Sequence, residues 1–150
     1  MVCSRLPSGL LAASARLTPE GLSSEHEGTA VQAVVDLGSS LTLCTWAAAE
    51  AIGLRRQGDP RARLTDDVIA GATGEPVRVW EARLTVELGG VRREDMLVNI
   101  ADLPIFGAIG LPAAAAVIGL DTLAPRADGG AEEQGSRVVL AARDGRVWLE

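Results

Sequence analysis

Hydrophobic and polar positions alternate most regularly over residues 80–88, which predicts a half-exposed antiparallel β-strand. Apolar residues occupy every second position from Trp80, and the positions between them hold Glu, Arg and Thr. A period of two places alternate side chains on opposite faces of a strand. Gly89-Gly90 follows directly and predicts a hairpin turn, with a return strand that runs to about Ile100.

A second kind of strand is predicted over residues 29–36, where both alternating sets of side chains are largely apolar. Such a strand is buried on both of its faces. It runs into Asp36, and a Gly- and Ser-containing turn separates it from another short apolar strand at residues 41–44. A short helix should follow, with Thr45 as its N-cap and Gly53 just beyond its C-terminus.

The other segments predict mainly short strands joined by hairpins. Residues 9–17 suit a first strand, residues 55–67 a charged surface connection, and residues 68–76 a hairpin with a glycine-bearing tip. Residues 111–116 are apolar and compatible with a helix, and residues 137–149 form a hairpin around Asp144-Gly145. We therefore expect a mainly β fold, closed or sandwich-like, with one or two short helices.

Composition restricts the classes of partner. The chain has 20 acidic and 14 basic residues, a formal net charge of −6, and no stripe of arginines, so nucleic acid is not expected as a partner. Neither Cys3 and Cys44 nor the single His26 has the spacing of a metal site, and no metal or other cofactor is expected. No disulfide between the two is expected, which suits a reducing compartment. No apolar run approaches bilayer length, so no membrane partner is expected.

Length and motif content indicate one folded domain. The 150 residues suffice for one core, and the key motif described next occurs once. We expect a poorly defined N-terminal segment over residues 1–27, with a possible first strand, and a folded domain over residues 28–150. A cytoplasmic location is expected. A short targeting signal is the alternative, because the first nineteen residues carry Arg5 and Arg16 but no acidic residue.

The segment after the buried strand, Val34-Val-Asp-Leu-Gly-Ser-Ser40, resembles the active-site signature of aspartic proteases. That signature is two hydrophobic residues, Asp, Thr or Ser, Gly, and Ala or Ser. In the family, a sharp turn presents the catalytic carboxylate at a two-fold axis. The resemblance makes Asp36 the candidate catalytic residue and Leu37, Gly38 and Ser39 the active-site turn. Gly38 would permit the turn, and the Ser39 hydroxyl would hydrogen-bond the outer carboxylate oxygen.

A second segment, Val117-Ile-Gly-Leu-Asp121, resembles the hydrophobic-hydrophobic-Gly element of the single-lobe, retropepsin-like aspartic proteases. In that fold a strand passes beneath the active-site turn and enters a short helix. The resemblance makes Ile118, Gly119 and Asp121 structural residues of the second motif. Asp121 is also the residue type that favours a helix N-cap, so we expect it to cap that helix.

Residues 69–74 occupy the place where retropepsins keep a glycine-bearing flap hairpin. The resemblance gives four candidate flap or substrate-binding residues: Ala70, Gly71, Ala72 and Gly74. Residues 144–149 resemble the closing hairpin of bacterial and retroelement members. Together these likenesses span residues 28–149 and imply a closed retropepsin-like, acid-protease β-barrel.

The resemblance also implies a chemistry. A water held between two carboxylates attacks the peptide carbonyl, while one Asp accepts its proton and the other donates to the carbonyl oxygen. Two carboxylates about 3 Å apart cannot both ionise, so they share one proton and titrate as a pair, and aspartic proteases are the standard example. Since the motif occurs once, the second carboxylate would be Asp36 of another copy in a two-fold homodimer. The other expected partner is an extended peptide or protein substrate.

Leu37 leaves a second function open. It stands where the family usually has Thr or Ser, whose hydroxyl bonds across the dimer, and a leucine cannot make that bond. An inactive dimerisation or peptide-binding module with the same fold is therefore the alternative to an endopeptidase. Retention of Asp36 favours the enzyme, because a disused buried carboxylate carries a desolvation cost. A third alternative is an unrelated ligand-binding β-barrel in which residues 36–39 form only a β-turn.

Overall fold

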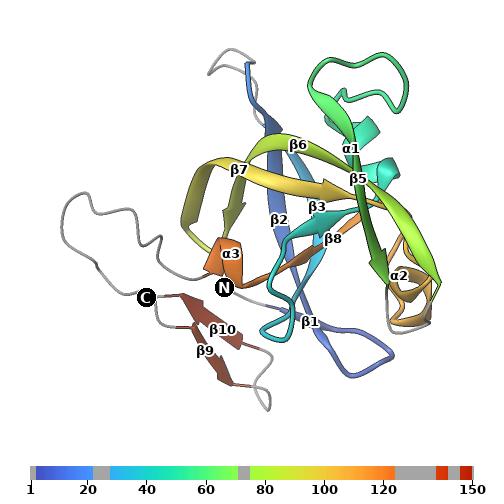
Figure 1. Ribbon diagram of the computed structural model, residues 1–150. Coiled ribbons are helices and arrows are strands. Elements are labelled where there is room, and N and C mark those ends of the chain that lie inside the picture. Colours follow the sequence, from blue (N-terminus) through green and yellow to red (C-terminus); the bar gives the residue numbers. More distant parts are fainter. Residues whose placement is uncertain (1–2, 22–27, 71–74, 124–137, 142–145, 150) are drawn as a thin grey trace.

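The computed structural model describes residues 3–21, 28–70, 75–123, 138–141 and 146–149, in which strands predominate (Figure 1). The strands are β1 (Ser4–Arg5), β2 (Leu11–Pro19), β3 (Thr29–Val35), β4 (Leu43–Cys44), β5 (Ala62–Ala70), β6 (Pro76–Leu88), β7 (Val91–Ile100), β8 (Ala115–Ile118), β9 (Val138–Ala141) and β10 (Arg146–Leu149). The helices are α1 (Trp46–Ala51), α2 (Ile105–Ala108) and α3 (Leu120–Leu123).

Eight strands form one sheet that closes on itself. Its order is β1-β2-β3-β8-β4-β7-β6-β5, and β2 also pairs with β6, so the strands from β2 to β6 in this order complete a barrel. Leu17 of β2 lies opposite Thr29 of β3 on one side and Val86 of β6 on the other. The expected mainly β, closed-barrel fold is confirmed, although the described residues contain three short helices rather than one or two.

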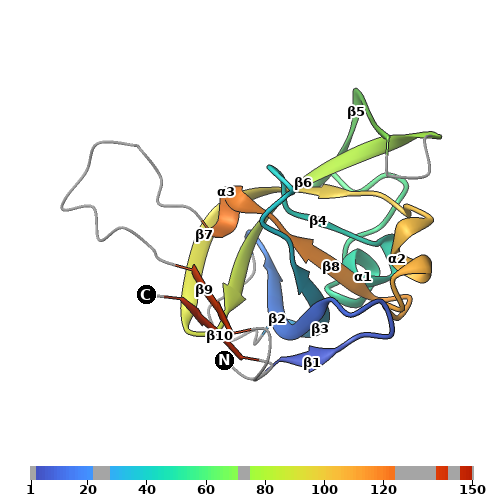
Figure 2. The same cartoon turned by 90° about the horizontal axis from the view of Figure 1, so that it is seen from below.

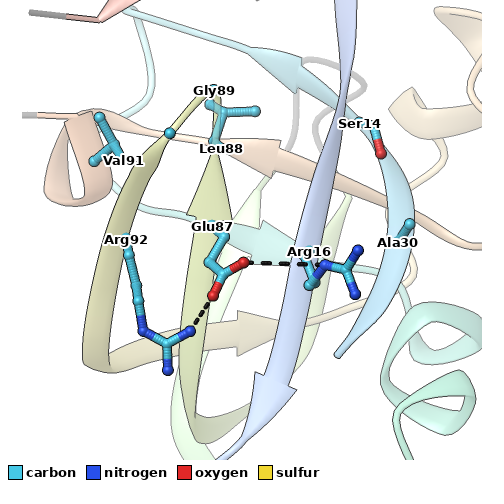
Figure 3. A pocket seen from close by; sticks show the side chains of 9 residues that line it. Ser14, Arg16, Ala30, Glu87, Leu88, Gly89, Val91 and Arg92 are labelled. Carbon is cyan, nitrogen blue, oxygen red and sulfur yellow. Dashed lines mark hydrogen bonds and ion pairs between the residues drawn. The ribbon is translucent and has the colours of Figure 1, made fainter. Parts of the chain in front are cut away.

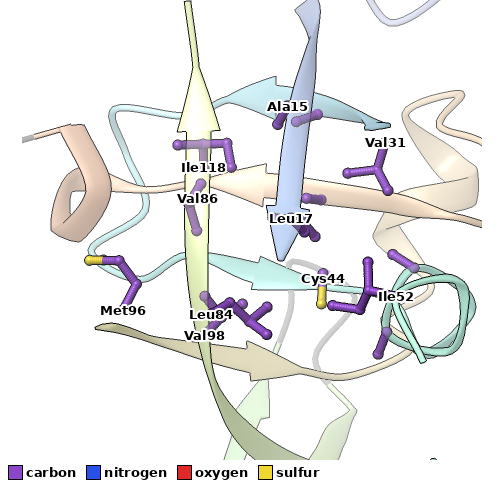
Figure 4. Close-up of a cluster of buried hydrophobic side chains, with 14 of the residues drawn as sticks. Ala15, Leu17, Val31, Cys44, Ile52, Leu84, Val86, Met96, Val98 and Ile118 are labelled. Carbon is purple, nitrogen blue, oxygen red and sulfur yellow. The ribbon is translucent and has the colours of Figure 1, made fainter. Parts of the chain in front are cut away.

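The inside of the barrel is filled by the apolar faces of its strands (Figure 4). The alternation predicted for residues 80–88 is confirmed in β6, where Leu84, Val86 and Leu88 are buried. A fully buried aliphatic side chain of this size contributes about 1.5–3 kcal/mol. Thr85 was expected on the exposed face of β6, but it is buried and its hydroxyl lies 3.2 Å from Glu20 Oε1.

The strand predicted over residues 29–36 is β3, and both of its faces pack against apolar clusters. Val31 and Ala33 belong to the barrel interior. Val34 points the other way, into a second buried cluster that includes Leu43 of β4, Val117 of β8 and other side chains around α2. The backbone just before Asp36 is therefore held by packing on two sides.

The predicted boundaries of the first helix are confirmed. The Thr45 hydroxyl accepts a hydrogen bond from the Ala48 amide at 3.2 Å and caps α1 at its N-terminus. Gly53 follows the C-cap in a left-handed conformation with φ +84°, which a residue without a Cβ adopts at little cost. Gly89 and Gly90, at φ 59° and 90°, likewise make the predicted β6–β7 turn.

Two sequence-based predictions are wrong. Residues 111–116 contain no helix: α2 lies earlier, and Ala115–Ile118 form β8. Residues 115–118 form a strand despite their helical propensity, because β8 pairs with β3 and β4 and all of its side chains are buried. The charged connection expected over residues 55–67 ends at Ala62, where β5 begins. The pairing of β5 with β6 is supported by an ion pair between Arg63 and Glu81.

The C-terminal hairpin predicted over residues 137–149 is formed by β9 and β10, which pair antiparallel from Val138–Leu149 to Ala141–Arg146. Its predicted turn at Asp144-Gly145 lies outside the described residues, as does His26. No helix in the described part of the chain has the length and apolar character needed to cross a membrane.

The Cys44 thiol should be unreactive in the folded protein. Burial, and to a smaller degree the Asp102 carboxylate, raises the pKa of the Cys44 thiol to about 12. We expect a thiol reagent at pH 8 to label the partly exposed Cys3 and to reach Cys44 only after denaturation, as measured by mass mapping of the labelled peptides. Equal labelling rates in the folded protein would contradict the burial. The pKa of the Cys44 thiol in the folded protein is higher than its ordinary value of 9.0. The thiol therefore contributes to the free energy of unfolding below about pH 9, and this contribution is lost as the pH rises toward 12.

Candidate active site

Asp36 directly follows β3 and is fixed through its backbone and one carboxylate oxygen. Its amide donates to the Ile118 carbonyl oxygen at 3.0 Å, so the chain leaves β3 still bonded to β8. The Gly38 amide donates to Asp36 Oδ1 at 2.9 Å, and the Ser39 amide donates to the Asp36 carbonyl oxygen at 3.2 Å. Asp36 itself is exposed and not buried as expected, so the desolvation argument for its retention does not apply. Its carboxylate is accessible to water, to a peptide and to another protein.

A glycine is needed at position 38 because there is little room for a side chain. A Cβ on Gly38 would lie 3.2 Å from Asp36 Oδ1, a close contact directly beside the carboxylate. The backbone of Gly38 is not in the left-handed region, so conformational freedom is not the reason for the residue type. Glycine lets the turn fold tightly over the carboxylate that it orients.

The second motif passes beneath this turn, as expected. β8 lies between β3 and β4, parallel to the first and antiparallel to the second. After β8, the Leu120 amide donates to the Ser39 carbonyl oxygen at 2.9 Å, and the Asp121 amide donates to that of Ser40 at 3.3 Å. A Cβ on Gly119 would lie 2.4 Å from the Leu41 carbonyl oxygen. The two chain segments can approach this closely only because residue 119 is glycine.

A buried threonine joins the two motifs, and the sequence analysis did not single it out. Thr42 is 0% exposed; its hydroxyl donates to Asp121 Oδ1 at 2.6 Å and accepts from the Gly119 amide at 3.0 Å. The same hydroxyl lies 2.7 Å from Thr122 Oγ1, and the Thr42 amide donates to Asp121 Oδ2 at 2.8 Å. The one available signal was a polar residue within the apolar run at residues 41–44.

Two side chains behave differently from their expected roles. Asp121 does not cap α3: it lies within the first turn of that helix, and its carboxylate faces Thr42 instead. The Ser39 hydroxyl donates to the Leu41 carbonyl oxygen at 2.7 Å, and not to Asp36 as expected. A serine hydroxyl has one proton, and a carbonyl two residues along the same turn receives it.

Of the flap candidates, Ala70 belongs to the pair of strands β5 and β6, which projects from the barrel (Figure 2). Ala70 is the last residue of β5, lies opposite Pro76 and is exposed. Gly71, Ala72 and Gly74 lie outside the described residues. Lower in the hairpin, Ile69 and Val77 pack against the second apolar cluster, which contains Val34 near Asp36.

A hollow with charged residues lies at the other end of β3 (Figure 3). Glu87 pairs there with Arg16 and Arg92, and Ala30 lines the opposite wall. Ala30 is six residues before Asp36, which corresponds to roughly 20 Å of extended strand. The hollow is therefore separate from the Asp36 turn, and its two arginines share the single Glu87 carboxylate.

The six-stranded closure and the passage of β8 beneath the Asp36 turn define a retropepsin-like, acid-protease fold. Residues 22–122 match the model of a family described as aspartyl protease, and the chain belongs to that family. This membership supports a hydrolase that acts on peptide bonds.

One solved structure in particular agrees with the fold. The protein is similar to EIAV protease complexed with the inhibitor HBY-793, at a TM-score of 0.53 and 17% identity over 76% of this chain and 85% of that chain. It is also similar to a retropepsin-like aspartic protease from Rickettsia conorii, at a TM-score of 0.49 and 14% identity over 82% and 76% of the two chains. No curated protein sequence matches.

Gly119→Ala should destabilise the protein because its methyl group would collide with the Leu41 backbone, which cannot move without shifting the active-site turn. We expect a loss of about 1–3 kcal/mol in the free energy of unfolding, measured by urea denaturation. The control is Gly107→Ala in α2, where a Cβ meets nothing within 4 Å and stability should stay the same or rise. Equal effects of the two variants would refute the role of close packing at residue 119.

Proposed function

We propose that the protein is a homodimeric aspartic endopeptidase in which two copies of Asp36 form the catalytic pair. The observation that carries the proposal is the exposed Asp36 carboxylate at the end of a strand packed on both faces, in a turn hydrogen-bonded to the second motif. Rigid placement of this kind is what a catalytic acid or base requires. One chain supplies one such carboxylate, so a second copy supplies the other.

In this proposal the two carboxylates hold one proton and one water molecule between them. The ionised Asp36 removes a proton from the water as its oxygen attacks the peptide carbonyl carbon, and the protonated Asp36 donates to the carbonyl oxygen. Collapse of the tetrahedral intermediate breaks the carbon–nitrogen bond, with a proton passing to the leaving amine. No covalent enzyme intermediate and no metal are involved. Gly38 contributes through its amide, which holds Asp36 Oδ1 at 2.9 Å.

The substrate proposed for this site is an extended stretch of polypeptide. The β5–β6 hairpin would close over it, with Ala70, Gly71, Ala72 and Gly74 as the flap residues. Backbone hydrogen bonds to an extended peptide supply affinity independent of its sequence, and closure excludes bulk water from the reacting bond. The packing of Ile69 and Val77 against the cluster that holds Val34 supports this role, because it links the hairpin to the strand that carries Asp36.

Asp36→Asn should abolish proteolysis, because an amide can neither accept the proton of the water nor share one with its partner. We expect a fall of about three orders of magnitude or more in the rate of cleavage of an unfolded protein substrate. The wild-type rate should rise faster than linearly with enzyme concentration, because two copies build one site. Asp95→Asn is the control, since Asp95 is exposed on β7 in a surface ion pair with Arg83.

Cleavage that persists in Asp36→Asn would refute the assignment of the catalytic residue. A specific observation also favours a second candidate function, a catalytically inactive dimerisation or peptide-binding module: Leu37 has no hydroxyl to bond across a dimer. That function gains support if the wild-type protein is folded and dimeric but cleaves nothing at any concentration.

Leu37→Thr separates these two functions. Threonine restores a hydroxyl beside Asp36 at an exposed position, so it should be tolerated in the fold. In an enzyme limited by loose pairing of the turns, we expect cleavage to rise several-fold, about what one new hydrogen bond supplies. Leu37→Val, which has the shape of threonine without its hydroxyl, is the matched control. Equal rates for the two variants would exclude a hydroxyl effect.

A further inference from the structure

Arg56 lies in the loop after α1, and its guanidinium contacts side chains from three other places in the fold. It donates to Asp102 Oδ2, and its central carbon lies 5.0 Å from the ring centre of Trp46 and 6.0 Å from that of Trp80. A planar guanidinium that faces aromatic rings and a carboxylate at once has few other orientations. We call Arg56, Trp46, Trp80 and Asp102 the Arg56 cluster.

The two tryptophans of the Arg56 cluster are held by ring contacts. Their ring centres are 5.3 Å apart and their planes meet at 81°, an edge-to-face arrangement. Trp46 is 2% exposed, yet its Nε1–H has no hydrogen-bond acceptor among the described residues. A buried indole usually has an acceptor that fixes its orientation. The orientation of Trp46 therefore depends on the contacts of its ring, and Arg56 supplies one of them.

Asp102 connects the Arg56 cluster to the entry of α2. Its Oδ1 accepts from the Trp46 amide at the start of α1 at 2.9 Å, while its Oδ2 accepts from Arg56. The next residue, Leu103, belongs to the second apolar cluster, and its carbonyl oxygen accepts from the Phe106 amide in α2. Because both oxygens of Asp102 are engaged, the segment that leads into α2 is fixed relative to α1.

Trp80 connects the Arg56 cluster to the β5–β6 hairpin. It pairs with the last residue of β7, so it lies where β6 leaves that strand. Three residues closer to the hairpin tip, Val77 packs against the second apolar cluster, and Ile105 of α2 packs against the same cluster. That cluster also contains Val34, two residues before Asp36. The hairpin and α2 therefore meet beside the strand that carries the candidate catalytic residue.

Other arginines near Arg56 have more local contacts. Residues 55–63 hold four arginines. Arg61 and Arg63 each form an ion pair with one acidic residue nearby. Arg55 is exposed, and its backbone amide donates to Asp59 Oδ2 at 3.0 Å. In the described structure, Arg56 is the one of the four whose side chain joins α1, β6 and the entry of α2.

We propose that Arg56 is a positioning residue that sets the spacing between the β5–β6 hairpin and α2, and through it the affinity for an extended polypeptide. The inference rests on the proposed function, in which the hairpin closes over the substrate. Arg56 acts through Trp80 and Asp102 and not on the reacting atoms. Its loss should therefore weaken substrate binding and leave the chemical step at Asp36 unchanged.

Arg56→Ala tests this in the full chain, with Arg55→Ala, the same loss of charge one residue earlier, as the matched control. In hydrogen-exchange mass spectrometry, we expect the amides of residues 62–70 and 103–109 to exchange about three- to tenfold faster in Arg56→Ala. The amides of residues 29–35 should exchange as in the wild type. Arg56→Lys keeps the charge but not the planar group, so its exchange should lie between the two.

Substrate affinity is the second readout. The probe is fluorescently labelled lactalbumin, reduced and carboxymethylated so that it stays unfolded, and its binding is measured by anisotropy in an Asp36→Asn background. Arg56→Ala should weaken binding about three- to tenfold, the effect of losing one half-exposed ion pair with aromatic contacts. In cleavage assays KM should rise by the same factor with kcat within about twofold of the wild type. A variant that was merely less folded would lose kcat at an unchanged KM.

The proposal is overturned if Arg56→Ala and Arg55→Ala behave alike, if residues 29–35 exchange as fast as the hairpin, or if kcat falls at unchanged affinity. Circular dichroism checks folding, and Arg56→Lys carries the test if the alanine variant is unfolded. A wild type that cleaves nothing but binds the probe, and binds it less well after Arg56→Ala, refutes the enzyme and supports the role of Arg56. Normal wild-type cleavage with undiminished affinity in Arg56→Ala refutes that role and keeps the enzyme, and a wild type that neither binds nor cleaves overturns both.

Discussion

The site depends on the hydrogen bonds made by the Thr42 hydroxyl group. It is wholly buried, and it meets Asp121, Thr122 and the Gly119 amide at 2.6, 2.7 and 3.0 Å. A buried polar group is costly unless it is bonded, and a network in which each member is satisfied permits few other arrangements. Its three partners are about eighty residues away in sequence. One side chain thus sets where the second motif lies beneath the turn that carries Asp36.

The barrel adds a second constraint by enclosing β3 from both sides. Val31 and Ala33 lie in the interior cluster and Val34 lies in the outer one, while β2 and β8 flank the strand in the sheet. The last residues before Asp36 therefore have few alternative positions. Exposure rises over two residues, from buried Val34 through partly exposed Val35 to exposed Asp36. A strand packed on both faces thus holds the accessible Asp36 carboxylate in a defined position.

Much of this could be predicted from the sequence, because the strongest signals were local. The period-two pattern of β6, the glycine turn after it and the caps of α1 each lie within a few residues, and all were predicted. The Asp36 turn and the second motif were found through their resemblance to a family. The failures were of another kind. The local sequence of residues 111–116 is compatible with a helix. Part of this segment forms strand β8 instead, because it pairs with β3 and β4. Neither the contact of Asp121 with Thr42 nor the double pairing of β2 can be seen in a local pattern.

The bond between the Asp36 amide and the Ile118 carbonyl has a consequence for the order of events during synthesis. Parallel pairing of β3 with β8 joins residues more than eighty positions apart, and contacts of such separation form late because a long loop must first close. A nascent chain that has already made β3, the turn and β4 still lacks the strand between them. The carboxylate is therefore present from early in translation, but its geometry is established only after residue 118 has left the ribosome.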